Sequence, residues 1–171
     1  MGRLIGIRQL VQVRRKLRAQ KRTVVFTNGT FDIIHRGHVE YLAKAKRMGD
    51  VLIVGLNTDA SIRRIKGKGR PINHSSDRAA VLAALGAVDY VCCFGENTPR
   101  RIIDQLTPDI LVKGADWSKE NIVGRETVER HGGAVRRIRL TPQKSTTRII
   151  ERVLSSFQGR RTDSRYRARK R

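Results

Sequence analysis

The chain has 171 residues, 39% of them hydrophobic, which is enough for one globular domain with a sizeable buried core. No stretch is apolar enough over a bilayer-spanning length, and the first residues lack the apolar run of a secretory signal. We therefore expect a cytoplasmic protein without a membrane span. The formal net charge is +22 at pH 7, from 37 Lys and Arg residues against 15 Asp and Glu residues, and this excess indicates anionic partners.

The positive charge is concentrated at the two ends of the chain. Residues 1–22 carry eight basic residues and no acid, and residues 159–171 carry seven basic residues and one acid. The remaining +8 on residues 23–158 suits an enzyme with phosphate substrates and does not require nucleic acid. Residues 159–171 have almost no apolar side chain, so we predict a disordered basic tail, either a solubilising segment or an arm with weak polyanion binding.

The first predicted element is a basic amphipathic helix over residues 6–20, so we expect a basic N-terminal helix in residues 1–22 and the main domain in residues 23–158. Strands are expected at residues 23–27, 51–56, 88–94, 109–112 and 134–138. Helices are expected at residues 38–48, 59–65, 75–85, 98–106, 119–130 and 145–157.

The expected strands are nearly continuous apolar runs, as in residues 51–56. Such runs are typical of strands that are buried on both faces of a parallel sheet. The alternation of strands and helices therefore predicts an α/β fold, a Rossmann-like doubly wound five-stranded parallel sheet with helices on both faces. Ligands of such sheets bind beyond the carboxyl ends of the strands.

Residues 27–38 join the first strand of the main domain to the next helix and end in His-x-Gly-His. His35 and His38 lie three residues apart at the entrance of that helix, where free backbone N–H groups and the helix dipole favour an anion. Gly29 lets the backbone of the preceding turn approach phosphate oxygens. This segment therefore predicts a phosphate site.

Two further segments are candidates for anion binding. Residues 66–71 form a glycine-containing basic loop, which would either close over phosphates or remain a solvated loop. Ser145, Thr146 and Thr147 precede an apolar helical pattern and predict a second anion cradle, with an ordinary N-cap as the alternative for Ser145.

The remaining thiols and imidazoles do not suggest a metal site. Cys92 and Cys93 are adjacent in an apolar run with no partner pair for zinc, so we predict two small buried thiols. His74 and His131 are expected at the surface. No carboxylate cluster has the spacing of a magnesium cage, so no metal ligands are predicted in the protein itself.

With these motifs the sequence resembles the His-x-Gly-His nucleotidyltransferases, and among them the D-glycero-β-D-manno-heptose 1-phosphate adenylyltransferases. The resemblance covers about residues 5–155 and depends on the segments 27–38, 56–61, 108–117 and 145–147. Relatives usually carry a glycine within the two residues before Ser-Thr-Thr, where this chain has Gln143 and Lys144. The geometry of that loop is left open.

The resemblance implies an adenylyltransferase that moves AMP from ATP to the sugar phosphate by in-line attack, with Mg²⁺ delivered with ATP. Catalytic roles are implied for His35, His38 and Lys66. Nucleotide-binding roles are implied for Thr27, Asn28, Gly29, Thr30, Phe31, His35, His38, Gly114, Asp116, Ser145, Thr146 and Thr147. Substrate-binding roles are implied for Asp32, Lys66, Arg70 and Arg78.

The residues leave alternatives open for two of these roles and for the function itself. Asp32 would contact a sugar hydroxyl or stabilise its turn, in preference to ligating metal, and Arg78 would be a phosphate ligand or a surface residue. The acceptor and base could be those of a glycerol-3-phosphate cytidylyltransferase or a flavin adenylyltransferase. A third alternative is a nucleic-acid-binding protein that uses the basic ends. A homodimer is also left open.

Overall fold

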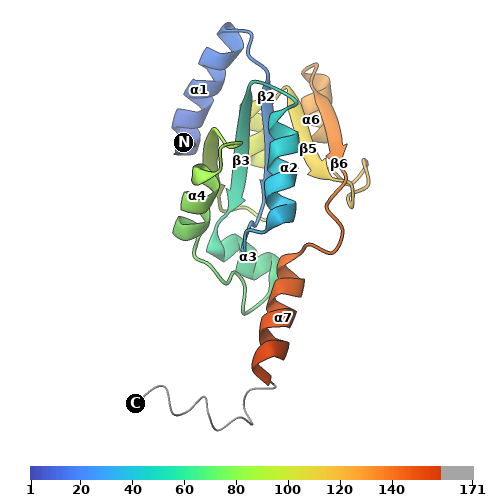
Figure 1. The fold of residues 1–171 in the computed structure, drawn as a ribbon. Coiled ribbons are helices and arrows are strands. Elements are labelled where there is room, and N and C mark those ends of the chain that lie inside the picture. Colours follow the sequence, from blue (N-terminus) through green and yellow to red (C-terminus); the bar gives the residue numbers. More distant parts are fainter. Residues whose placement is uncertain (159–171) are drawn as a thin grey trace.

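Six parallel strands form the central sheet of the computed structural model, which describes residues 1–158 (Figure 1). The strands are β1 (Arg3–Leu4), β2 (Val24–Gly29), β3 (Val51–Asn57), β4 (Tyr90–Phe94), β5 (Ile110–Gly114) and β6 (Ala134–Ile138). Their order is β1-β4-β3-β2-β5-β6, and every neighbouring pair is parallel. The five expected strands are present within a few residues. The predicted count of five was wrong, because β1 has two residues and is too short to show a periodic pattern.

Helices cover both faces of the sheet. They are α1 (Ile7–Ala19), α2 (Arg36–Lys46), α3 (Asp59–Lys66), α4 (Ser75–Ala84), α5 (Arg100–Leu106), α6 (Arg125–Arg130) and α7 (Thr146–Gln158). One apolar cluster joins α1, α5 and α6 to the sheet, and a second joins α2 and α4 to it. This two-sided core is the doubly wound arrangement expected from the sequence.

One expected helix, over residues 119–130, is much shorter in the structure. Residues 119–124 form turns, and α6 begins only after Gly124, which has a φ of 87°. A left-handed residue of this kind cannot continue a right-handed helix, and Gly124 therefore sets the boundary.

The N-terminal helix α1 belongs to the same core as the rest of the sheet. Leu10 and Leu17 are buried in it, and Arg14 is only 4% exposed. The Arg14 guanidinium donates to the Leu106 carbonyl over 3.1 Å and to Asp109 Oδ1 over 2.8 Å. Two of the helix's cations, Arg14 and Arg18, thus hold the connection between α5 and β5.

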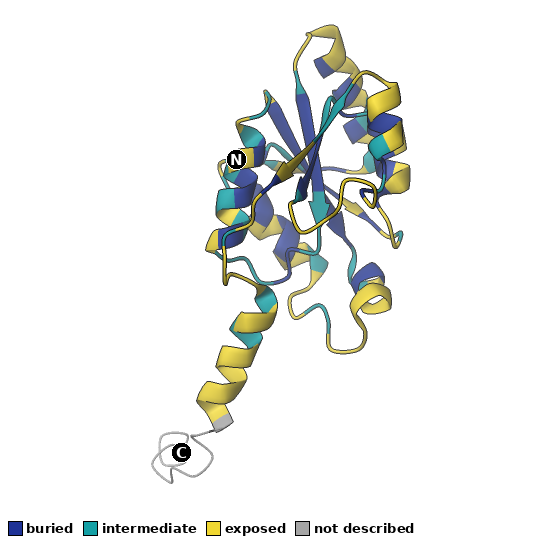
Figure 2. Ribbon diagram, turned by 90° about the vertical axis from the view of Figure 1, so that its right-hand side faces the viewer, coloured by how far each residue is buried: buried dark blue, intermediate teal, exposed yellow. Residues whose placement is uncertain are grey.

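The polypeptide reverses its direction of travel across the sheet at β2. β3 lies on one side of β2 and β5 on the other, so the carboxyl ends of β2 and β5 border the switch point of the topology. Figure 2 shows the buried strands at the centre and the largely exposed α7 extending away from them. The arrangement leaves a ligand crevice where the sequence motif predicted one.

Several smaller expectations are settled by burial. Cys92 is buried as predicted, whereas Cys93 is exposed, because successive side chains of a strand point to opposite faces. His74 and His131 are exposed, as expected. No helix within residues 1–158 is long and apolar enough to cross a membrane. The predicted tail, residues 159–171, lies outside the described residues.

Candidate functional site

A cavity of about 520 Å³ opens at the carboxyl ends of β2 and β5. It collects most of the residues that the sequence singled out, from four separate segments of the chain. The predicted residues on its wall are Asn28, Gly29, Thr30, Phe31, His35, His38, Lys66, Arg70, Gly114, Asp116, Ser145, Thr146 and Thr147. Thr27, Asp32 and Arg78 do not line it, and each of these has another place in the structure.

The two histidines of the motif stack on each other at the N-terminus of α2. Their ring centroids are 3.8 Å apart with an interplanar angle of 18°, and the Phe31 ring meets His38 edge-on at 5.1 Å. His35 is the N-cap residue, but its side chain makes no capping hydrogen bond. In both rings Nδ1 is buried without a hydrogen-bond partner in the described part of the chain. Both rings are therefore held mainly by packing, and a hydrogen bond with the Ile33 backbone also holds His38.

The electrostatic surroundings keep both imidazoles neutral at pH 7. Burial, followed by the neighbouring His35, lowers the pKa of His38 to about 4. Burial and the charge of Lys144 lower the pKa of His35 below its usual value. A neutral imidazole has one N–H donor and one acceptor nitrogen, so each ring can donate one hydrogen bond to a phosphate oxygen.

Two glycines make the close packing around these rings feasible. A Cβ at Gly29 would lie 3.0 Å from the Phe31 ring, and Phe31 itself has a φ of 41°, in the left-handed region. A Cβ at Gly37 would lie 3.1 Å from both the His35 ring and the Lys144 Cβ. The glycines are thus needed for packing within the site, in addition to the backbone approach predicted for Gly29.

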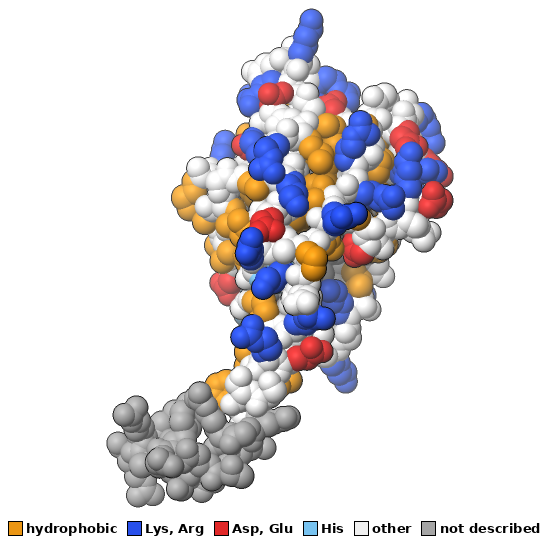
Figure 3. Space-filling model, turned by 45° about the vertical axis from the view of Figure 1, so that its right-hand side comes forward, with side chains coloured by type: hydrophobic (Ala, Val, Ile, Leu, Met, Phe, Trp, Pro, Cys, Tyr) orange, Lys and Arg blue, Asp and Glu red, His pale blue; other side chains and the backbone are white. Residues whose placement is uncertain are grey.

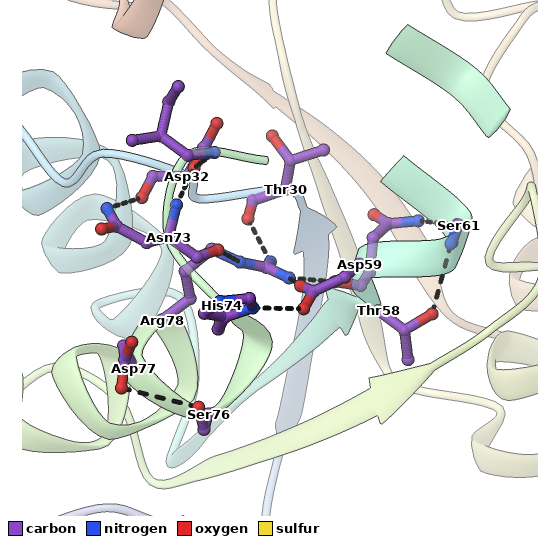
Figure 4. Close-up of polar contacts among 12 residues, drawn as sticks. Thr30, Asp32, Thr58, Asp59, Ser61, Asn73, His74, Ser76, Asp77 and Arg78 are labelled. Carbon is purple, nitrogen blue, oxygen red and sulfur yellow. Dashed lines mark hydrogen bonds and ion pairs between the residues drawn. The ribbon is translucent and has the colours of Figure 1, made fainter. Parts of the chain in front are cut away.

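Asp32 fastens the segment that follows the basic loop. Its carboxylate accepts from the backbone N–H group of Asn73 over 3.0 Å (Figure 4). It also accepts from the Ile72 backbone N–H over 2.8 Å and from Arg70 Nη1 over 2.9 Å. Burial alone would raise the pKa of Asp32, but these backbone and Arg70 hydrogen bonds lower it below its usual range. Of the three roles weighed for Asp32, turn stabilisation matches these contacts. Arg70, which lines the cavity, is held by this ion pair.

Arg78 is a buried positioning residue, and this corrects the expectation of a substrate ligand or a surface arginine. Its side chain is 1% exposed. The guanidinium donates to three carbonyl oxygens and to one carboxylate oxygen, at 2.7 to 3.0 Å, as Figure 4 shows. The acceptors are the carbonyls of Thr30, Asn57 and Asn73 and Asp59 Oδ1. Arg78 therefore ties the motif turn to the end of β3 and to the segment before α4.

Thr27 lies beneath the cavity, so its predicted nucleotide contact is also replaced by a structural one. Its side chain is fully buried, and Thr27 Oγ1 lies 2.7 Å from the Tyr41 hydroxyl. That hydroxyl in turn donates to the Val112 carbonyl over 3.2 Å. The chain of hydrogen bonds joins β2, α2 and β5 under the cavity floor.

The second predicted cradle is present at the start of α7. Ser145 Oγ accepts from the Arg148 backbone N–H over 3.2 Å, which is the contact of an N-cap, while Ser145 still lines the cavity. Gln143, one of the two positions within which relatives usually have a glycine, has a φ of 60°. The loop thus keeps a left-handed residue without the glycine that usually occupies such a place.

Lys113 is a cavity residue to which the sequence analysis gave no role of its own. It is 9% exposed, lines the cavity from the end of β5, and donates to Asn28 Oδ1 over 2.5 Å. Burial lowers its pKa to about 8, and Asp116 partly opposes that shift. The signal was available, because a lysine inside an apolar strand run rarely stays buried without a specific partner.

The described residues offer no protein-held metal centre. No three or more His, Cys, Asp or Glu side chains cluster within residues 1–158. Both Asp32 carboxylate oxygens are already engaged, and Asp116 is the single acidic residue of the described cavity wall. By contrast, the cavity wall carries the cations Lys66, Arg70, Lys113 and Lys144. Figure 3 shows basic side chains scattered over one face of the molecule. The charge of the cavity wall therefore favours anions.

Comparison with known proteins agrees with this geometry. The cytidylyltransferase-like family model matches residues 26–152. "Bifunctional protein HldE" of Syntrophotalea carbinolica is 52% identical over 153 residues, which are 90% of this chain and 31% of that protein. The protein of the same name from Citrifermentans bemidjiense is 58% identical over 134 residues, 78% of this chain and 28% of that protein. The chain thus spans about a third of the length of these relatives.

Two solved structures support the fold. A lipopolysaccharide core biosynthesis protein from Thermoplasma volcanium is 29% identical with a TM-score of 0.59, over 72% of this chain and 99% of that one. A pantoate-beta-alanine ligase from Francisella tularensis, solved with beta-gamma ATP and beta-alanine, is 14% identical with a TM-score of 0.60, over 84% of this chain and 69% of that one. The second match concerns the fold alone.

Proposed function

Because the chain belongs to the cytidylyltransferase-like family, we propose that it transfers AMP from ATP to D-glycero-β-D-manno-heptose 1-phosphate, giving ADP-heptose and pyrophosphate. The observation that carries the proposal is that one cavity brings together the histidine pair, the basic loop and the start of α7. Identity of 52–58% to proteins named HldE and similarity to a lipopolysaccharide core biosynthesis protein support the choice of acceptor.

The proposed reaction needs positioning and charge stabilisation and no covalent enzyme intermediate. An oxygen of the sugar phosphate attacks the α-phosphorus of ATP, and the bond to the bridging α,β-oxygen breaks as pyrophosphate leaves. The neutral His35 and His38 each donate an N–H to the phosphate oxygens that gain charge. The start of α7 supplies backbone N–H groups, and Lys66 supplies a cation from the loop.

Mg²⁺ is proposed to enter with ATP and to neutralise charge on the triphosphate, bound chiefly by phosphate oxygens and water. The engaged oxygens of Asp32 and the lack of an acidic cluster in residues 1–158 argue against a cage made by the protein. Because ATP is an intracellular nucleotide, the cytoplasm remains the proposed compartment.

The nucleic-acid alternative gains no support from the described residues. Arg14 and Arg18, two of the eight N-terminal cations, make contacts within the fold. Polyanion binding by residues 159–171 and the homodimer remain predictions. Polyanion binding by the tail can be tested by measuring nucleic-acid affinity at several salt concentrations, for the full chain and for a chain without residues 159–171. If the tail binds nucleic acid, the affinity of the full chain should fall steeply with salt, and the deletion should remove this dependence.

A pyrophosphate-release screen tests the proposed function. ATP and CTP are each paired with heptose 1-phosphate, glycerol 3-phosphate and flavin mononucleotide, and the nucleotide product is identified by mass. We expect turnover with ATP and heptose 1-phosphate to exceed every other pair. Preferred turnover of another pair would refute the assigned acceptor or base, and no turnover with any pair would refute the transferase.

A further inference from the structure

Lys113 lies at the switch point of the sheet, between the two strands whose ends border the cavity. β2 and β5 are hydrogen-bonded neighbours, and Lys113 and Asn28 lie at their carboxyl ends. The 2.5 Å hydrogen bond from Lys113 Nζ to Asn28 Oδ1 spans this junction. The lysine is thereby fixed at the place where doubly wound sheets bind their ligands.

The described part of the protein supplies a hydrogen-bond acceptor to only some of the N–H donors of the Lys113 ammonium. A lysine ammonium has three N–H donors, and one donor of Lys113 binds the neutral amide of Asn28. The Trp117 ring lies 5.7 Å from Nζ, and Asp116 is the acidic group that acts on the lysine electrostatically. Burying a cation with so little compensation is unfavourable unless an anion completes its surroundings.

The other cations of the cavity wall lie elsewhere on it. The charges of Lys144 and Lys66 lower the pKa values of His35 and His38, so these two lysines lie near the histidine pair. Arg70 forms the ion pair with Asp32. Lys113 therefore lies apart from the part of the cavity wall that His35 and His38 form. It is a cation held in a fixed position at the end of β5.

In-line transfer requires two separate anionic subsites. The leaving pyrophosphate and the attacking phosphate must lie on opposite sides of the α-phosphorus. If His35 and His38 stabilise the leaving side, the attacking phosphate monoester needs a cation elsewhere on the wall. Lys113 satisfies this requirement, because it lines the cavity from the end of β5, is buried, and is held in place by Asn28.

We propose that Lys113, positioned by Asn28, binds the phosphate monoester of the acceptor and orients it toward the α-phosphorus. This inference rests on the proposed function and adds the residue that recognises the acceptor's phosphate. Lys113 is then a determinant of acceptor binding, while the nucleotide is bound by the histidine wall and α7.

The test measures binding of each reactant separately, by calorimetry, to the wild type and to Lys113→Met. Heptose 1-phosphate without nucleotide reports the acceptor subsite, and α,β-methylene ATP reports the nucleotide subsite. Losing charge-assisted hydrogen bonds should weaken heptose 1-phosphate binding about 10- to 100-fold. Binding of α,β-methylene ATP should change by less than about threefold. Lys44→Met, an exposed position outside the cavity, is the matched control and should leave both affinities unchanged.

Equal losses for both ligands, or a loss confined to α,β-methylene ATP, would overturn the assignment. Lys113→Arg keeps the charge and should recover part of the acceptor affinity. If wild-type protein binds no heptose 1-phosphate, the acceptor in the proposed function is wrong as well. If the wild type binds it and Lys113→Met binds it equally, only the role of Lys113 fails.

The wild-type protein supplies a second readout that does not depend on a folded variant. Lys113 loses its proton as pH rises through about 8, with Asp116 the acidic group that opposes the shift. Acceptor affinity should therefore fall above about pH 8, by up to tenfold per pH unit, while α,β-methylene ATP affinity stays flat. A flat acceptor profile up to pH 9.5 would contradict the proposal.

Discussion

Replacing Arg78 by methionine should destabilise the whole fold and not selectively weaken substrate binding. The substitution removes a guanidinium that is 1% exposed and keeps an apolar chain of similar length. Four acceptors lose their donor: the carbonyls of Thr30, Asn57 and Asn73, and Asp59 Oδ1. Methionine can offer none of them a hydrogen bond.

The magnitude follows from how deeply each acceptor is buried. The hydrogen bond to the Asn57 carbonyl is buried, and leaving such an acceptor unpaired costs about 1–3 kcal/mol. The other three contacts are part-buried, so water can replace the donor at a cost of about 0.5–1 kcal/mol each. The total is about 2.5–6 kcal/mol, which includes the about 3–5 kcal/mol found when a buried ion pair loses one partner. For a chain of this size that loss lowers Tm by about 5–24 °C.

Thermal and urea unfolding of the wild type and Arg78→Met measure this loss. Arg101→Met is the control, because Arg101 is 71% exposed and forms a surface ion pair with Glu96. That pair contributes about 0–1 kcal/mol to the free energy of unfolding. A Tm for Arg78→Met within 2 °C of the wild type, with a raised KM for one substrate, would refute the positioning role and restore Arg78 as a ligand.

Three further changes test the packing and electrostatics around the cavity. Asp32→Ala removes the carboxylate that binds Arg70 and the Ile72 backbone N–H at the end of the basic loop. Trypsin should then cut after Lys66 or Lys68 several-fold faster than in the wild type. An unchanged cleavage rate would argue against this role of Asp32. Gly124→Ala places a Cβ 2.7 Å from the buried Ile103 side chain, at a residue with a φ of 87°. Urea unfolding should show a free energy of unfolding that is lower by about 2–4 kcal/mol. A decrease below about 0.5 kcal/mol would contradict the observed turn. Burial lowers the pKa of His38 to about 4, so the unfolded state binds more protons than the folded state between pH 6.5 and pH 4. The free energy of unfolding should therefore fall as pH falls through that window, and it should fall less steeply in His38→Gln. If the free energy of unfolding of the two proteins falls equally with pH, the effect of His38 is excluded.

The order and type of the main elements could be predicted because the sequence pattern follows burial. Strands β2, β3 and β5 are runs with both faces largely covered, and such runs have few other structural explanations. β1 could not be predicted in this way, because its two residues have exposed side chains and are held by backbone pairing with β4. The start of α6 depended on the left-handed conformation of Gly124, which periodicity does not report.

The candidate site was predictable where local segments build it. The histidine motif and the start of α7 each form a helix entrance from consecutive residues, and both line the cavity. The roles of Asp32 and Arg78 depend on carbonyl and N–H groups contributed by distant segments, so only the folded chain reveals them. For Lys113 the sequence offered only the unusual position of a lysine in an apolar strand run, because its partner Asn28 lies 85 residues away in sequence.

The most direct test of the proposed function is the turnover number for ATP and heptose 1-phosphate, measured by pyrophosphate release with wild type and His38→Ala. We predict that the wild type forms a product with the mass of ADP-heptose. His38→Ala should retain the fold and lose about two to four orders of magnitude in kcat, as expected for one charge-stabilising donor. Wild-type protein that releases no pyrophosphate, or His38→Ala with a near-normal kcat, would contradict the proposed reaction at this cavity.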